Sequence, residues 1–184
     1  MFKAKSFFLG VLIGVLGLIA GGLAVGVVQA QSFGGAASTA NRPIVTGTVQ
    51  CFATTRRDNA NGAATANAIR ASRGLGDMRP NDKLAAAAAR HACDMAQRNQ
   101  MTHQGSRLRK PSHRVRAQGY RQTIVAENIG KGFDSAEQIQ RAWVNSRSHL
   151  SNILLPQVEE FGIGRAVAAD GRTVYWAAVY AAPR

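Results

Sequence analysis

The stretch FGIGRAVAADGRTVYWAAVYA, residues 161–181, decides the class of fold. Two apolar runs, 161–168 and 173–181, flank the pair Asp170-Gly171, which is typical of a tight turn between antiparallel strands. In the second run, apolar side chains occupy both the odd and the even positions. In a strand these two sets of side chains point to opposite faces. The stretch predicts a β-hairpin, which needs further strands and a helical cover to be stable.

Upstream of the hairpin the pattern is mostly helical. Residues 81–100 predict a long helix that begins at Asn81 or Asp82 and contains consecutive alanines at 85–89, which favour a helix packed closely on its neighbour. Helices that precede a hairpin, with at least one strand between them, predict an α+β layered domain. The other expected elements are helices at 61–73, 112–118, from 134 or 135 onward and at 148–154, and extended segments at 44–52 and 123–129.

The N-terminus predicts export from the cytoplasm. Lys3 and Lys5 precede an uncharged stretch at 7–28, and Val28-Gln29-Ala30 has the small residues of a cleavage site. We expect residues 1–30 to be a signal peptide cut after Ala30; the alternative is an uncleaved membrane anchor, because the stretch is long enough to span a bilayer. Residues 31–59 are expected to be a flexible linker, and 60–184 the folded domain. The protein is therefore expected in the periplasm or outside the cell, or attached to the inner membrane if residues 1–30 remain.

Length and charge limit the classes of partner. The chain has 184 residues, 46% of them hydrophobic, and a formal net charge of +13, which suits one basic domain with a real core. Such a charge fits nucleic acid, anionic lipid or cell-wall polymer. Export removes nucleic acid from this set, and we expect a monomer. A basic run follows the long helix and is interpreted either as a solvated face or as a contact for envelope polymer or phospholipid: Arg107, Arg109, Lys110, Arg114, Arg116 and Arg121.

The chain contains two cysteines, Cys51 and Cys93. Both lie in the part expected to be exported, where disulfides persist. Two cysteines without CxxC spacing make a poor zinc site. We expect a Cys51–Cys93 disulfide; the alternative is two unrelated buried thiols.

Three residues are the best candidates for chemistry: His103, Glu127 and His149. Two imidazoles and a carboxylate can bind a divalent metal ion or move protons. Ser146 precedes His149 by one helical turn but lacks the Gly-x-Ser-x-Gly elbow of a serine nucleophile, and is interpreted as a polar contact. His91 and His113 are expected to face solvent and are given no role.

The order of motifs resembles the CAP superfamily, which comprises cysteine-rich secretory proteins, antigen 5 and plant pathogenesis-related proteins, and it looks most like the bacterial branch. The resemblance covers roughly residues 60–182. It rests on motifs that follow one another in unbroken order: Asn67-x-x-Arg70, the Ala-rich helix ending in Met95, Met101-x-His103, Glu127-Asn128-Ile129, Trp143-x-x-Ser146-x-x-His149-x-x-Asn152-Ile153-Leu154, Gly162-Ile163-Gly164 and Tyr175-Trp176.

This resemblance implies an α-β-α sandwich with a central, mainly antiparallel sheet and a broad cleft lined by two histidines and acidic residues. His103, Glu127 and His149 fall on the cleft positions, where some family members hold zinc or another divalent ion. Family members are associated with sterol or lipid binding, cell-wall and defence roles, and disputed protease activity. The sequence departs from the animal and plant pattern at Ser146, which replaces a second cleft glutamate, and at Ala126, which often is glycine.

These observations predict an exported binding module rather than a dedicated enzyme. Its cleft is expected to be lined by His103, Glu127, Ser146 and His149, and to take an envelope polymer, an anionic lipid or a small apolar ligand. Zinc or another divalent cation is expected to be held weakly, by His103 and His149. One alternative is a metal-assisted hydrolase with Glu127 as its base. The other is a protein that binds envelope polymer or lipid through its arginines.

Overall fold

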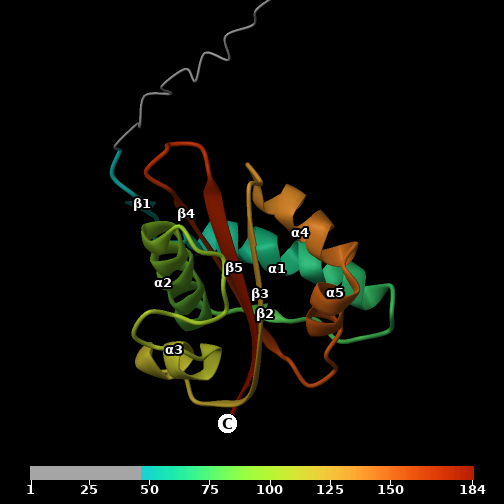
Figure 1. Ribbon diagram of the computed structural model, residues 1–184. Helices are drawn as coiled ribbons and strands as arrows, with labels where there is room; N and C mark the ends of the chain where they lie inside the picture. Colours follow the sequence, from blue (N-terminus) through green and yellow to red (C-terminus); the bar gives the residue numbers. More distant parts are fainter. Residues whose placement is uncertain (1–46) are drawn as a thin grey trace, which may run out of the picture. The chain divides into compact units, whose positions relative to one another are not determined.

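The computed structural model describes residues 47–184, which form one compact unit (Figure 1). The expected signal peptide or anchor at 1–30 and the first part of the expected linker lie outside the described residues. In the part that is described, no helix is both long enough and apolar enough to cross a membrane.

A five-stranded sheet forms the middle layer. Its path runs β1 (Gln50–Cys51), β4 (Glu160–Val167), β5 (Val174–Pro183) and β3 (Gln122–Lys131), with all neighbours antiparallel, and β2 (Arg79–Pro80) pairs in parallel with β4. β4 and β5 are the predicted hairpin. Asp170 Oδ1 accepts the backbone N–H groups of Arg172 and Thr173, at 2.9 and 2.8 Å, and so fixes the turn. β3 is an edge strand that pairs with β5 on one side. Side chains from both helical layers can approach its other side.

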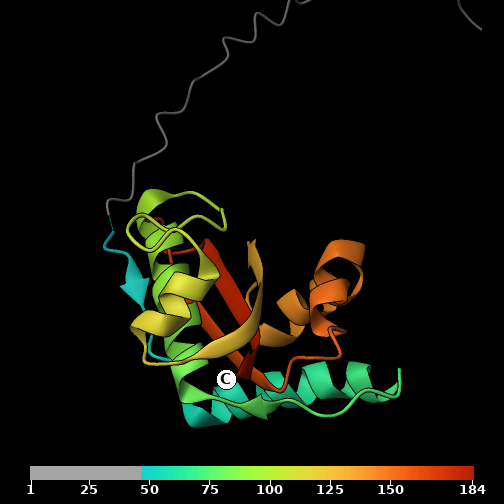
Figure 2. The ribbon, with the colours of Figure 1, turned by 90° about the horizontal axis from the view of Figure 1, so that it is seen from below.

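Helices cover both faces of this sheet. α2 (Asp82–Arg98) and α3 (Pro111–Ala117) lie on one face, and α1 (Arg56–Ala71), α4 (Ala136–Val144) and α5 (Arg147–Ile153) on the other (Figures 1 and 2). Each face has its own apolar core, one around Leu84 and Met95 of α2, the other around Trp143 of α4 and Phe161 of β4. The predicted α-β-α sandwich is confirmed.

The alanines of α2 allow that helix to lie almost on the backbone of β4. A Cβ atom built on Gly162 would stand 2.1 Å from Ala85 N, and one built on Gly164 would stand 2.2 Å from Ala89 N. Real Cβ atoms essentially never come so close, so both positions require glycine while the helix stays where it is. The alternation Gly162-Ile163-Gly164 thus turns its glycines to α2 and its isoleucine to the other core.

The folded domain begins earlier than residue 60, the expected boundary. α1 starts at Arg56 because Thr55 caps it, its Oγ1 accepting the N–H of Asp58 at 3.1 Å. Further upstream, Gln50 and Cys51 pair with Val167 and Ala166 of β4. The polar, small-residue composition of this segment did not reveal the helix cap, whereas β1 lies within the extended segment expected at 44–52.

The expected disulfide joins Cys51 to Cys93. It connects β1 to α2, and neither of the chain's two cysteines is free. Two predicted helix starts are confirmed as well. Asn81 caps α2 by accepting the N–H groups of Lys83 and Leu84, and Ser135 caps α4.

Candidate functional site

Glu127 lies at the centre of the candidate site, on β3. Its neighbours Val125 and Ile129 pack into the core beneath α2, so the alternation of the strand turns Glu127 to the same face. The carboxylate is 2% exposed. Its Oε2 accepts a hydrogen bond from Arg114 Nη2 at 2.5 Å, and its Oε1 accepts one from His103 Nδ1 at 2.9 Å. A buried carboxylate needs such partners, and here a charged guanidinium supplies the main one.

Arg114, the partner of Glu127, was expected on the protein surface. It belongs to the basic run interpreted as a solvated face or envelope contact, yet it is buried on α3. While Nη2 pairs with Glu127, Nη1 donates to the carbonyl oxygens of His103, Leu108 and Arg109 at 3.1, 3.0 and 3.3 Å. One side chain therefore neutralises Glu127 and fixes the loop that carries His103.

His91 is the second residue that was misplaced, because it was expected to face solvent. It is 1% exposed, with Nε2 donating to the Thr102 carbonyl at 3.0 Å and lying 3.6 Å from Glu127 Oε1. Burial is the largest cause that lowers the pKa of His91, although Glu127 raises it. A usable signal was present, since His91 stands three residues after Ala88 and four before Met95, on the apolar face of α2.

His103 presents one ring nitrogen outward from the loop between α2 and α3. Its side chain is 53% exposed, although Nδ1 is held by Glu127. A carboxylate oxygen accepts this hydrogen bond, so Nδ1 carries a proton, and in the neutral form of the ring Nε2 keeps its lone pair. Within residues 47–184 that Nε2 forms no hydrogen bond.

His149 approaches from the opposite helical layer. Ser146 stands at the N-cap position of α5, and its Oγ lies 2.9 Å from His149 Nδ1 instead of capping a backbone N–H group. Asn128 Nδ2 donates to the His149 carbonyl at 3.0 Å, and Asn152 Nδ2 donates to the Glu127 carbonyl at 3.2 Å, so α5 is fastened to β3 beside the carboxylate. Partial burial is the first cause that lowers the pKa of His149, and the positive charge that His103 carries when it is protonated is the second.

A metal ion at this site would have two histidine nitrogens as its protein ligands. Among residues 47–184, no group of three or more His, Cys, Asp or Glu is arranged to hold a metal. Glu127 has both oxygens occupied, which leaves Nε2 of His103 and Nε2 of His149. Each Nδ1 has an oxygen partner, the outer contact that orients a ligating imidazole. Two nitrogens are fewer than the three protein ligands of a usual catalytic zinc, so any metal would be weakly held.

Comparison with known proteins identifies the family. Residues 64–180 match the family described as "CAP: Cysteine-rich secretory protein family". The chain belongs to the CAP family. This CAP domain is 32% identical over 98 residues to protein YkwD of Bacillus subtilis, a match that spans 53% of the chain and 38% of that relative's length.

Solved structures show the same fold at low sequence identity. An extracellular SCP-domain protein of Bacillus anthracis is 21% identical with a TM-score of 0.61, covering 68% of this CAP chain and 40% of its own. An outer surface protein of Borrelia burgdorferi is 18% identical with a TM-score of 0.60, covering 71% of this chain and 96% of its own. At such identities the two likenesses show the fold alone.

Proposed function

We propose that this CAP domain works outside the cytoplasm, in the periplasm or secreted, as a binding protein whose ligand contacts His103 and His149 without turnover. The observation that carries the proposal is the occupied carboxylate of Glu127. Its Oε2 accepts from Arg114 at 2.5 Å and its Oε1 accepts from His103 at 2.9 Å. What is left for a ligand is a pair of imidazole nitrogens rather than an acid and a base.

The same ion pair argues against a hydrolase that uses Glu127 as its base. A general base must be within reach of the proton that it removes. Glu127 is buried, and both its oxygens already accept hydrogen bonds from protein donors. Protonating the carboxylate would also leave Arg114 buried without its counter-charge, which is unfavourable. Glu127 is therefore better described as a positioning residue that sets the tautomer of His103.

Zinc or another divalent cation is proposed as a weakly held part of this site. His103 and His149 would hold it through Nε2, with Glu127 and Ser146 on the two Nδ1 atoms. When bound, the ion would offer a Lewis-acid contact to an oxygen of the ligand. Without it, the two imidazoles can still donate or accept hydrogen bonds, so a polar or anionic group of an envelope molecule is the ligand chemistry that fits.

Zinc titration by calorimetry tests the site, with the metal alone as the probe. We expect saturable heat for the unmodified protein and at least about tenfold weaker binding for His103→Ala and His149→Ala, the loss that even outer-shell changes cause at metal sites. His113→Ala is the matched control, because His113 is exposed on α3 and should leave binding unchanged. Equal heats for all four proteins would place zinc elsewhere and overturn the site. Peptide or ester hydrolysis that disappears in Glu127→Gln would favour the hydrolase instead.

A further inference from the structure

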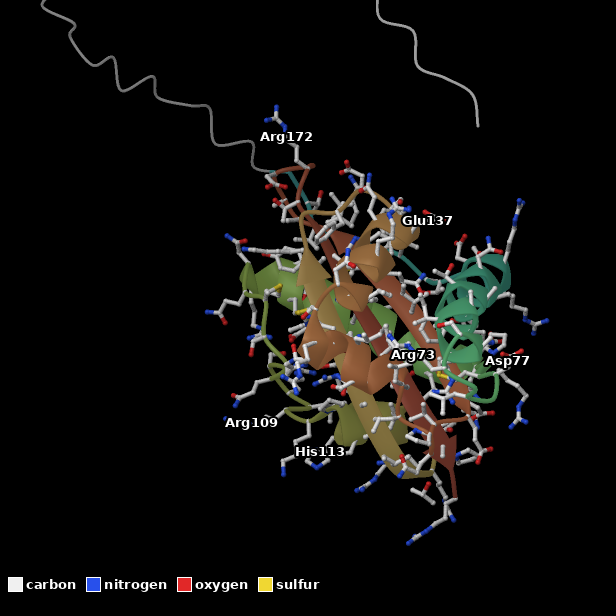
Figure 3. The ribbon with its side chains drawn as sticks, turned by 90° about the vertical axis from the view of Figure 1, so that its right-hand side faces the viewer. Arg73, Asp77, Arg109, His113, Glu137 and Arg172 are labelled. Carbon is white, nitrogen blue, oxygen red and sulfur yellow. A yellow bond between two sulfur atoms is a disulfide. The ribbon has the colours of Figure 1, made fainter. Side chains whose placement is uncertain are left out.

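A second surface lies on the loop that carries His103, but other residues line it, and its positive charge is uncompensated. Residues 95–126 contain seven Lys and Arg side chains and no carboxylate. Five residues of this segment line a pocket of about 490 Å³; we call them the basic loop surface: Gln104, Arg107, Arg109, Lys110 and His113. Figure 3 shows Arg109 and His113 near one another at the margin of the molecule, far from Arg172 at the opposite end.

The cations of this surface have no counter-ions. All ten Asp and Glu side chains of the chain lie within residues 47–184, and none forms an ion pair with Arg107, Arg109 or Lys110. Two neighbouring arginines behave differently, since Arg98 pairs with Asp94 and Arg114 pairs with Glu127. Three permanent charges gathered around one concavity, without an acid among its lining residues, favour an anionic partner.

Exposed apolar side chains accompany these charges. Met101 is 48% exposed and Leu108 is 40% exposed, and they are the two exposed large hydrophobic residues among those described. Both come from the same loop, and Leu108 lies between Arg107 and Arg109. Cations that surround an exposed apolar side chain suit a lipid–water boundary, where the charges meet headgroups and the apolar side chain meets acyl chains. A soluble polyanion has no acyl chains and would leave the apolar side chains without an apolar partner.

The loop is held in shape before any partner arrives. Arg114 binds three of its carbonyl oxygens, those of His103, Leu108 and Arg109. At the other side of the loop, Asp94 accepts the backbone N–H of Ser106 at 3.1 Å and the Ser106 hydroxyl. A surface ordered in this way loses little conformational freedom on binding.

We propose that the basic loop surface, with Met101 and Leu108, docks on anionic phospholipid headgroups. The proposal does not depend on the His103–His149 site. Each Lys or Arg near an anionic membrane surface contributes roughly a fivefold increase in binding, so the three permanent cations together account for about a hundredfold. Binding should weaken steeply with salt, because the charges are exposed.

Vesicle co-sedimentation of the full chain tests the proposal. Phosphatidylcholine vesicles are compared with vesicles that also contain phosphatidylglycerol, so any contribution of residues 1–46 to neutral membranes is subtracted. The triple variant Arg107→Ala, Arg109→Ala, Lys110→Ala should lose about a hundredfold of the phosphatidylglycerol-dependent binding. The matched control removes three exposed arginines outside the loop, Arg57, Arg73 and Arg172, and changes the net charge equally (Figure 3 labels two of them). It should lose less than about threefold.

Two further arms separate the explanations. Leu108→Ser should weaken vesicle binding by about threefold to tenfold, since part of an apolar side chain no longer enters the lipid boundary. His149→Ala, on α5 and outside the loop, should leave vesicle binding unchanged, even if it abolishes zinc binding. Equal loss in the two triple variants would reduce the effect to net charge and overturn the proposal. Binding to soluble polyphosphate that matches vesicle binding, with no effect of Leu108→Ser, would assign the surface to a polyanion instead.

Discussion

At the scale of single residues, Arg114 determines the state of the candidate site. It compensates the buried charge of Glu127 and holds three carbonyl oxygens of the neighbouring loop. Replacing two buried charges together can be nearly neutral, whereas removing one partner leaves an uncompensated charge that costs about 3–5 kcal/mol. Breaking the Arg114–Glu127 pair therefore lowers the stability of the fold strongly, although the intact pair contributes little net stability.

This asymmetry gives the first stability prediction. Arg114→Met should lower the free energy of unfolding by about 3–5 kcal/mol, because Glu127 then stays buried without a cation. The double variant Arg114→Met, Glu127→Gln should recover part of that loss, so the two single costs should not add. Urea unfolding measures all three variants, and Arg116→Ala, which removes an exposed arginine of the same helix, should stay within about 0.5 kcal/mol of the unmodified protein. A cost below about 1 kcal/mol for Arg114→Met would contradict the ion pair.

The residues of the candidate site were predictable only in part. His103, Glu127, Ser146 and His149 could be named from the ordered motifs, and the structure gives two contacts among them, His103 with Glu127 and Ser146 with His149. Whether they bind a ligand stays a prediction. His91 and Arg114 were missed because charge and polarity suggest solvent, and only the tertiary fold supplies the buried carboxylate that both approach.

At the scale of elements, the fold depends on how closely α2 approaches β4. The side chains of alanines 85–89 are single methyl groups, and Gly162 and Gly164 have no side chain. The backbones of α2 and β4 therefore come into contact. Interiors are packed densely, and one added methyl group has to move its neighbours. The position of α2 also determines the position of His91. The packing of α2 on β4 therefore affects the geometry of the candidate site.

Gly164→Ala should therefore be strongly destabilising. The added Cβ would stand 2.2 Å from Ala89 N, a backbone atom that moves only if α2 shifts. Overpacking of a core costs about 1–3 kcal/mol, and a contact with backbone falls at the upper end. Thermal and urea unfolding measure the loss. Gly76→Ala is the control, because nothing lies within 4 Å of a Cβ built there and its φ is not positive; it should be neutral or slightly stabilising. If Gly164→Ala were as stable as Gly76→Ala, α2 would be shown to shift away from β4 at little cost in free energy.

Most elements could be predicted because local chemistry determines them. The hairpin follows from its turn and alternation, and α2 and α4 begin at the caps Asn81 and Ser135. The start of α1 could not be placed, since Thr55 lies among other small polar residues that also suit a linker. β1 lies within the extended segment expected at 44–52, whereas β2 was not expected. Both strands have two residues and exist only by pairing with β4, and no local pattern predicts that pairing.

At the scale of the whole domain, the disulfide determines how the first described segment is held. β1 contributes two residue pairs to the sheet, Gln50 with Val167 and Cys51 with Ala166. So short an edge strand adds little stability by itself. The Cys51–Cys93 bond fastens it covalently to α2, across 42 residues of sequence that include all of α1. An exported protein can keep such a bond, because the compartments outside the cytoplasm are oxidising.

The size of this tether can be predicted and measured. Closing a loop of this length stabilises by about 4 kcal/mol in the chain-entropy account, which is an upper value. The variant Cys51→Ser, Cys93→Ser should unfold at lower urea concentration with an unfolding free energy reduced by up to that amount, and reduced unmodified protein should behave alike. Because the sheet beyond β1 keeps its own pairs, hydrogen exchange should rise chiefly at residues 47–55, while β5 stays protected. Uniform loss of protection would show instead that the tether holds the entire domain together, and unchanged stability would show that the β1 pairs suffice without it.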